Sequence, residues 1–92
     1  MEPIEIYPAL YVLKLVDDCW YVGMSYNLNN RLSQHMFGRG AKFTKLHRPI
    51  CVDKVIYPAI GFNIDNEVTL EYMEKYGKDK VRGGKFCRLI IK

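Results

Sequence analysis

Two tyrosines, Tyr11 and Tyr21, lie in two neighbouring segments that are rich in strand-forming residues. The segments, residues 9–16 and 19–23, are separated by an acidic dipeptide, which predicts a β-hairpin closed by a tight turn. In such a hairpin the two phenols could stand side by side above the sheet and bind or deprotonate a water molecule. Tyrosines on strands more commonly pack with the hydroxyl at the rim, so the pair alone leaves both interpretations open.

A second pair, Arg31 and His35, lies four residues apart in a segment whose apolar stripe, Leu28, Leu32 and Met36, predicts a helix. Residues at this spacing share one face of a helix. A guanidinium beside an imidazole suits phosphate chemistry, because arginine stabilises charge on phosphoryl oxygens and histidine moves a proton. A solvated arginine next to a half-buried histidine would produce the same spacing.

Acidic residues gather on a second predicted helix, residues 65–76. At about 100° per residue, Glu67, Glu71 and Glu74 fall within an arc of about 60°. One of these carboxylates, if aimed at the active face of the sheet, could hold a hard cation such as Mg²⁺ through oxygen. Three acids on one helical face are otherwise an ordinary solvated surface.

The elements that position these side chains follow from the pattern of strand formers, caps and breakers. After the hairpin comes a helix that Ser25 or Asn27 can cap and that Gly38 and Gly40 end. The later elements are a polar, basic connection (38–51), a third strand (52–60), the acidic helix (65–76) with Asp65 or Asn63 as cap and Gly77 as terminator, and an apolar run (86–91) that could pair as an edge strand. This order predicts a single α/β domain over residues 1–92, a small three-stranded antiparallel sheet flanked by helices.

The charge is divided into blocks along the chain. Residues 31–54 hold six bases against one acid, and residues 75–92 hold seven bases against one acid. Between them, residues 55–74 hold four acids and no base, and the formal net charge of the chain is +4. Basic blocks suit a phosphate backbone, because neutralising phosphates releases counterions, although clustered surface lysines would give a similar pattern.

Composition excludes several classes of protein. No stretch approaches the ~20 apolar residues of a membrane span, and the acidic start MEPIEIYPAL is unlike a secretory signal. Three widely spaced cysteines, Cys19, Cys51 and Cys87, together with two histidines, show no zinc-binding spacing. We therefore expect an intracellular protein of the cytoplasm or nucleus, with reduced, mostly buried thiols and no membrane partner.

The motifs, taken in order, resemble those of a known superfamily. Leu10-Tyr11-Val12 and, after eight intervening residues, Tyr21-Val22-Gly23 resemble the paired tripeptides that name the GIY-YIG nucleases. The segments Asn30–His35, Gly40–Thr44 and His47–Pro49 are similar to the branch that contains structure-specific endonucleases for branched DNA and small standalone bacterial relatives. The tail, Tyr76–Gly84, resembles that of standalone members from large DNA viruses, so the chain could be virus-encoded. The resemblance covers about residues 9–84.

This resemblance implies that the domain hydrolyses DNA phosphodiester bonds. Tyr21 or Tyr11 would orient and deprotonate the attacking water, and Arg31 would stabilise the pentacovalent phosphate. His35 would assist proton transfer or bind phosphate. Gly23 would let the backbone come close to the site, where a Cβ would intrude.

The resemblance also implies one divalent ion, Mg²⁺ or Mn²⁺, which stabilises the leaving oxygen. The segment Thr69–Tyr72 resembles the part of the family that carries the metal-binding glutamate, which places the ligand at Glu71. Glu67, one helical turn earlier, is the alternative, because helix geometry alone permits either.

Three cations of the first basic block, Lys42, Lys45 and Arg48, are the candidates for holding the DNA strand. Leu10 departs from the family by replacing the first glycine, and no zinc-binding domain of the branched-DNA nucleases is expected here. A role in repair or recombination on branched or damaged DNA follows from the resemblance. The alternatives are a catalytically weak nucleic-acid-binding module of the same fold and a purely structural interaction protein. Either a homodimer or a protein partner is compatible with this sequence.

Overall fold

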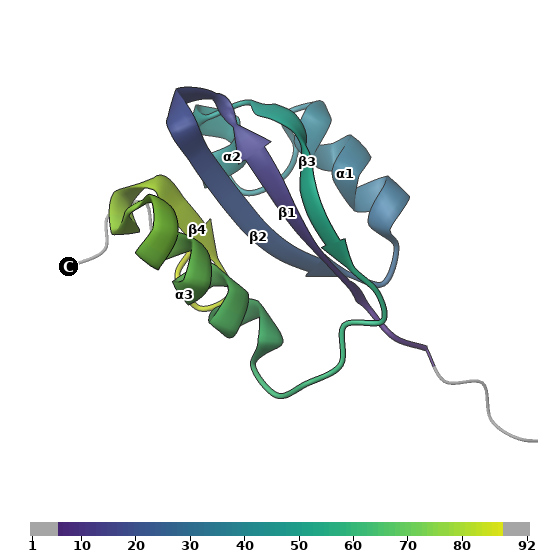
Figure 1. Ribbon diagram of the computed structural model, residues 1–92. Coiled ribbons are helices and arrows are strands. Elements are labelled where there is room, and N and C mark those ends of the chain that lie inside the picture. The colour runs from purple at the N-terminus through teal and green to yellow at the C-terminus, as the bar shows by residue number, and fades with distance from the viewer. Residues whose placement is uncertain (1–5, 88–92) are drawn as a thin grey trace, which may run out of the picture.

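The computed structural model describes residues 6–87 of the chain. A central sheet has the strand order β3-β1-β2-β4, and helices cover both of its faces (Figure 1). The elements in chain order are β1 (Ala9–Leu15), β2 (Cys19–Ser25), α1 (Leu28–Met36), α2 (Lys42–Leu46), β3 (Pro49–Ile56), α3 (Ile64–Tyr76) and β4 (Val81–Gly83).

The hairpin is formed as the sequence predicts. β1 and β2 pair antiparallel, with Tyr11 opposite Gly23 and Leu13 opposite Tyr21. The connection is a 3₁₀ turn in which Asp17 and Asp18 have φ values of 64° and 55°. Acidic and amide residues tolerate this left-handed backbone better than most, so the acidic dipeptide closes the hairpin.

The sheet differs from the expected three-stranded antiparallel one. It has four strands and is mixed, because β4 pairs parallel with β2, with Trp20 opposite Val81 and Val22 opposite Gly83. The edge strand is therefore formed by residues 81–83 rather than by the apolar run 86–91, of which residues 88–91 lie outside the described part. Parallel pairing requires a crossover, and α3 supplies it between the antiparallel strands and β4.

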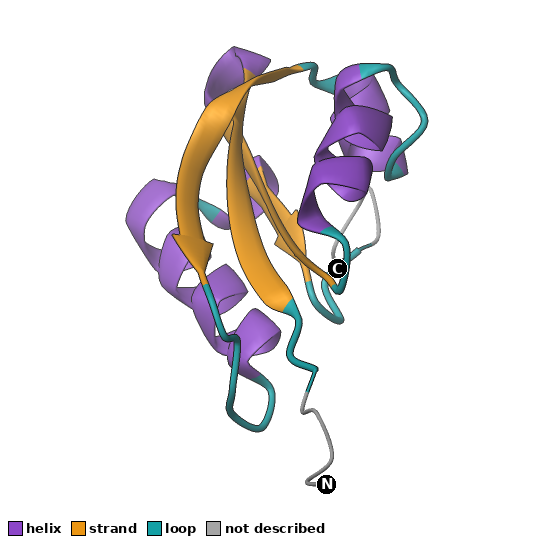
Figure 2. Ribbon diagram, turned by 90° about the vertical axis from the view of Figure 1, so that its right-hand side faces the viewer, coloured by secondary structure: helices purple, strands orange, loops and turns teal. Residues whose placement is uncertain are grey.

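The two faces of the sheet pack against different helices (Figure 2). On one face, Leu10, Val12 and Val22 are buried with the α3 residues Val68 and Met73. The other face carries a separate cluster of buried and partly buried residues from the hairpin, α1, α2 and the segment before α2, namely Tyr11, Leu13, Leu15, Cys19, Tyr21, Leu28, Leu32, Ala41 and Phe43. Because strand side chains alternate, both tyrosines lie on the face that α1 and α2 cover.

The basic connection contains a helix that the sequence pattern did not predict. α2 is only five residues long, and its Phe43 and Thr44 are 5% and 1% exposed. A single turn carries too little periodicity to be recognised, and it is held by these two tertiary contacts. The third strand begins at Pro49 rather than at residue 52 and ends at Ile56, two residues before Pro58.

The thiols are less buried than expected. Cys19 is buried in the hairpin, whereas Cys51 and Cys87 are exposed. Cys51 lies on β3, an edge strand whose residues are all partly or fully exposed. Across residues 6–87, every helix is too short or too polar to cross a membrane.

Candidate active site

The two tyrosines of the hairpin meet the imidazole of His35 under α1. The Tyr11 and Tyr21 ring centroids are 6.5 Å apart, and the His35 ring lies 5.6 Å from the first and 5.2 Å from the second. Tyr11 and His35 are each 1% exposed, whereas Tyr21 is 9% exposed. Arg31, one turn before His35, is half-buried, and its Nη1 donates to Gln34 Oε1 over 2.7 Å. The structure thus brings together four of the five expected catalytic side chains.

The start of α1 sets the position of both Arg31 and His35. The Asn27 side chain accepts a hydrogen bond from the backbone N–H of Asn30 over 3.2 Å, so Asn27 rather than Ser25 is the N-cap. From this start, the half-buried Leu28, Leu32 and Arg31 and the fully buried His35 fall on the side of the helix that faces the sheet.

His35 is held in a buried chain of hydrogen bonds. The Tyr11 hydroxyl lies 2.7 Å from His35 Nε2, and His35 Nδ1 lies 3.0 Å from Thr44 Oγ1. Thr44 Oγ1 in turn donates to the carbonyl of Ala41 over 2.8 Å. The chain therefore runs from β1 through α1 to α2, and the unexpected helix supplies its last side chain.

These contacts determine the protonation pattern of the imidazole. Because the only hydrogen of the Thr44 hydroxyl goes to the Ala41 carbonyl, Thr44 Oγ1 must accept from His35, so Nδ1 carries the proton. In neutral imidazole Nε2 is then an acceptor, and the Tyr11 hydroxyl must donate to it. Tyr11 is thus poised to pass its proton to His35.

Two glycines make this arrangement possible. A Cβ on Gly23 would overlap the Tyr11 hydroxyl, and a Cβ on Gly40 would overlap His35 Nδ1. The Tyr11 phenol therefore lies directly over the Gly23 backbone across the hairpin, where any side chain would displace it.

Burial changes the acidity of each group. It raises the pKa of Tyr11 to about 12, with a further rise from neighbouring Tyr21 that the nearby Arg31 partly offsets. Burial, followed by the Cys87 thiol, raises the pKa of Tyr21. Burial and then the charge of Arg31 lower the pKa of His35 to about 4. All three groups are therefore neutral at neutral pH in the free protein.

The low pKa of His35 predicts a loss of stability in acid. Between pH 6.5 and about 4 the unfolded chain protonates this histidine while the folded chain does not, so the stability present above pH 6.5 falls by up to about 3 kcal/mol. Urea unfolding across this range is expected to show the slope, and His35→Gln should reduce it. His47→Gln, at the more exposed histidine, is the matched control. An equal slope in wild type and His35→Gln would contradict the assignment.

Glu71, the expected metal ligand, does not join the tyrosines, so the five candidate residues do not lie on one face of the sheet. α3 packs against the opposite face of the sheet through Val68, Tyr72 and Met73. Glu67 and Glu71 lie on the outer side of this helix and are exposed. Burial and then the nearby Asp53 raise the pKa of Tyr72, and the charge of Glu71 adds a smaller rise. Its role as metal ligand stays a prediction.

Asp65 is the carboxylate of α3 that is partly buried. It lies in the first turn of α3. Burial raises the pKa of Cys87, and the charge of Asp65 raises it further. Cys87 in turn raises the pKa of Tyr21, after the larger effect of burial. Among residues 6–87, no three His, Cys, Asp or Glu side chains gather where they could hold a metal ion. The described residues therefore do not form a metal cage, so a divalent ion here would need most of its ligands from water and a bound phosphate.

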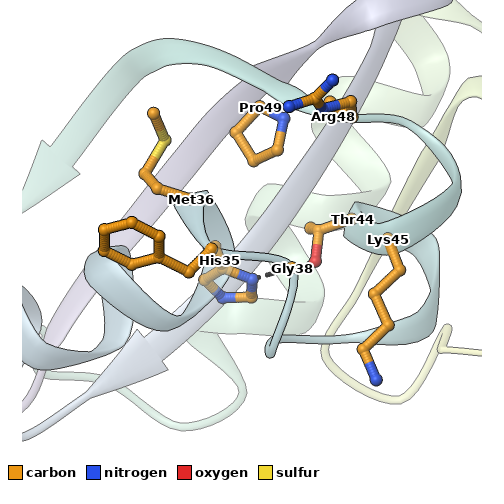
Figure 3. Close-up of a pocket in the computed structure, with 8 residues that line it drawn as sticks. His35, Met36, Gly38, Thr44, Lys45, Arg48 and Pro49 are labelled. Carbon is orange, nitrogen blue, oxygen red and sulfur yellow. Dashed lines mark hydrogen bonds between the residues drawn. The ribbon is translucent and has the colours of Figure 1, made fainter.

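The expected DNA-binding cations lie on α2 and directly after it. Lys42 and Lys45 lie on this helix and Arg48 follows it, and all three are exposed. Lys45 and Arg48 line a cavity of about 460 Å³ whose inner wall includes His35 and Thr44. Figure 3 shows Arg48 above and Lys45 below the imidazole in that view, with the His35–Thr44 hydrogen bond between them.

Two residues at the site escaped the sequence reasoning. Thr44 matters only through its contact with His35, nine residues away. Arg82 is 2% exposed beside the Phe43 ring, and its guanidinium carbon lies 5.2 Å from the ring centroid. It neighbours Tyr21 across the β2–β4 pair and donates to the carbonyls of Lys78 and Val81. Its place in a basic block was visible in the sequence, but its parallel pairing was not.

The fold and this tyrosine–histidine site indicate a class of protein, and the comparison with known families identifies that class. The GIY-YIG catalytic domain, which defines a family of nucleases, matches residues 7–85. The chain therefore belongs to the GIY-YIG family, in agreement with the resemblance of its motifs.

Small bacterial proteins are similar to this chain. The UPF0213 protein of Pediococcus pentosaceus is 38% identical over 65 residues, which cover 71% of this chain and 65% of that protein. The UPF0213 protein YazA of Bacillus subtilis is 45% identical over 40 residues, covering 44% of this chain and 40% of YazA. The chain thus spans about half the length of the curated relatives it matches. No solved structure matches it.

Proposed function

We propose that this domain is a divalent-metal-dependent endonuclease that hydrolyses DNA phosphodiester bonds. The observation that carries the proposal is the buried chain of Tyr11, His35 and Thr44, with Arg31 beside it. A purely structural core does not require buried polar side chains of this kind, because apolar side chains fill the same space and leave no buried polar atom that needs a hydrogen bond.

Proton transfer begins at Tyr11. As its oxygen takes a proton from the attacking water, its own proton passes to His35 Nε2, and the imidazolium that forms keeps its Nδ1–H on Thr44. Tyr21, the more exposed phenol, orients the water at the entrance. The structure favours Tyr11 over Tyr21 as the base because only Tyr11 has this hydrogen bond to the imidazole.

Arg31 links substrate binding to this proton transfer. Its charge opposes protonation of His35 in the free protein. A phosphodiester bound to Arg31 brings negative charge to the same place, which weakens that opposition and raises the pKa of His35 when it must accept a proton. The guanidinium also stabilises the charge that develops on the phosphoryl oxygens.

A bound divalent ion would neutralise the leaving oxygen of the DNA. The family resemblance places its ligand at Glu71 or Glu67, whereas Asp65 is the half-buried acid of α3 and its charge raises the pKa of Cys87, after the larger effect of burial. We propose Asp65 as the ligand, with Glu67 and Glu71 as the alternatives. The ion would be Mg²⁺ or Mn²⁺, because hard cations prefer carboxylate oxygen.

Plasmid nicking tests the function directly. Supercoiled DNA is expected to be nicked with Mg²⁺ or Mn²⁺ and left intact with excess EDTA. A binding module of the same fold would shift DNA in gels without cutting it, and a structural interaction protein would do neither. Duplex, forked and gapped DNA compared at equal concentration then test the proposed role on branched or damaged DNA in repair or recombination. Sedimentation with and without DNA tests for a homodimer.

Neutralising each acid in turn identifies the metal ligand. Asp65→Asn is expected to lower Mn²⁺-dependent nicking about 100-fold or more, because it removes the negative charge at the ion and keeps the side-chain shape. Glu67→Gln and Glu71→Gln are the matched controls and should stay within about threefold of wild type, since both side chains face solvent. Loss of nicking in Glu71→Gln, with Asp65→Asn active, would instead support the family-based assignment.

A further inference from the structure

The cavity behind His35 has the features of a binding site. It encloses about 460 Å³, within the range of about 300–1,000 Å³ that is typical of small-ligand sites. Its lining combines apolar side chains with Lys45, Arg48 and the buried polar residues His35 and Thr44. The lining side chains, all within the described residues, include no aspartate or glutamate. The charge of the cavity therefore suits an anionic ligand with an apolar part.

Phe37 is the unusual member of this lining. It follows directly on α1 and is 78% exposed, although a phenylalanine of the core would bury nearly all of its ring. The same side chain also lines a second hollow of about 150 Å³, together with Arg39. One exposed aromatic ring thus stands between two hollows, each of which contains an arginine.

An aromatic ring flanked by cations is the arrangement that binds unpaired nucleotides, because the base stacks on the ring while its phosphates meet the cations. Helical pairing would keep a base from reaching the ring. We propose that the cavity is a subsite for one unpaired nucleotide of the DNA substrate, with its base on Phe37 and its phosphates on Arg48 and Lys45. This inference rests on the proposed function and adds a substrate class, DNA with an unpaired nucleotide beside the cleaved bond.

The position of the cavity connects it with the reaction. His35 and Thr44 form part of its wall (Figure 3). The other nitrogen of the same imidazole, Nε2, is hydrogen-bonded to the Tyr11 hydroxyl. A nucleotide in the cavity would therefore be separated from Tyr11, the proposed general base, only by the side chain of His35. This separation suits a nucleotide adjacent to the phosphodiester that is cut.

The test compares two DNA duplexes of the same sequence, one fully paired and one with a single bulged 2-aminopurine nucleotide. Affinity is measured in EDTA, so that no cleavage occurs. The wild-type protein is expected to bind the bulged duplex about tenfold more tightly. Phe37→Leu should remove this preference without weakening binding to paired DNA. Phe62→Leu, at a 90% exposed aromatic on the β3–α3 connection, is the matched control and should keep it.

Arg48→Gln provides a second readout. It should weaken binding to both duplexes and reduce the salt dependence of affinity by about one counterion, because Arg48 contacts phosphate. Equal affinity of the wild type for the two duplexes would overturn the subsite. So would equal binding of a bulge that lacks its base, which would show that phosphate alone is recognised.

The outcome is separable from the nuclease test. A protein that nicks plasmid but shows no preference dependent on Phe37 keeps the proposed function and overturns the subsite. A protein that shows this preference but does not nick supports the subsite and contradicts the nuclease.

Discussion

Replacing Tyr11 with phenylalanine is expected to lower the rate of DNA cleavage by about 10²- to 10⁴-fold, the usual contribution of a general base. The ring would keep its place in the core, but no hydroxyl would remain to take a proton from water or pass one to His35 Nε2. DNA affinity should change little, because Tyr11 is 1% exposed and the phosphate contacts are assigned to other side chains. Single-turnover nicking together with gel-shift titration measures both quantities.

This substitution also has a structural cost that must be measured. Phenylalanine leaves His35 Nε2 buried without a donor, which destabilises the fold by about 1–3 kcal/mol. Urea unfolding of the variant shows whether it remains folded under the assay conditions. Tyr26→Phe, at a tyrosine that is 73% exposed, is the control and should cleave normally. The opposite result would contradict this assignment. If Tyr11→Phe cleaves well and Tyr21→Phe is inactive, then Tyr21 is the base.

Replacing Gly23 with alanine is expected to lower cleavage as strongly as Tyr11→Phe and to destabilise the protein. The added methyl group would overlap the Tyr11 hydroxyl and ring carbon, and the Tyr11 side chain is 1% exposed and hydrogen-bonded to the buried His35. Overpacking of this kind costs about 1–3 kcal/mol, a large part of the stability of so small a domain. The Tyr11–His35 hydrogen bond should break, so the loss of cleavage should equal that of Tyr11→Phe.

The Gly23→Ala result is read from unfolding and nicking measured on the same samples. Ser25→Ala, two residues further along β2 and only partly buried, is the control for substitutions on this strand. A Gly23→Ala protein with wild-type stability and cleavage would show that the Tyr11 phenol does not lie over residue 23. Combining Gly23→Ala with Tyr11→Phe should cost little further activity, because both changes remove the same hydrogen bond.

Local patterns in the sequence were sufficient for several elements. The hairpin follows from two runs of strand formers and an acidic turn, and α3 ends at Tyr76, just before Gly77, as predicted. The pairing of Arg31 with His35 on one helical face depends only on a spacing of four residues. Each of these features arises from neighbours within one or two turns, which is why it is visible without the fold.

The glutamates show where local reasoning stops. Helix geometry correctly placed Glu67 and Glu71 on one side of α3, and the structure buries Val68, Tyr72 and Met73 on another. It could not say on which face of the sheet α3 packs, because both faces of the hairpin carry apolar side chains. In the structure, α3 packs on the face opposite the tyrosines, and Glu71 is exposed to solvent.

The sequence by itself determined the family, the hairpin and the candidate catalytic residues, since these depend on motifs and short-range spacing. Only the tertiary structure decided that β4 pairs parallel with β2, that α2 exists, and that Thr44 fixes the protonation of His35. These features depend on contacts between segments far apart in the chain or too short to show periodicity. Their energies come from packing and burial rather than from local propensity, so they take shape only when the whole domain folds.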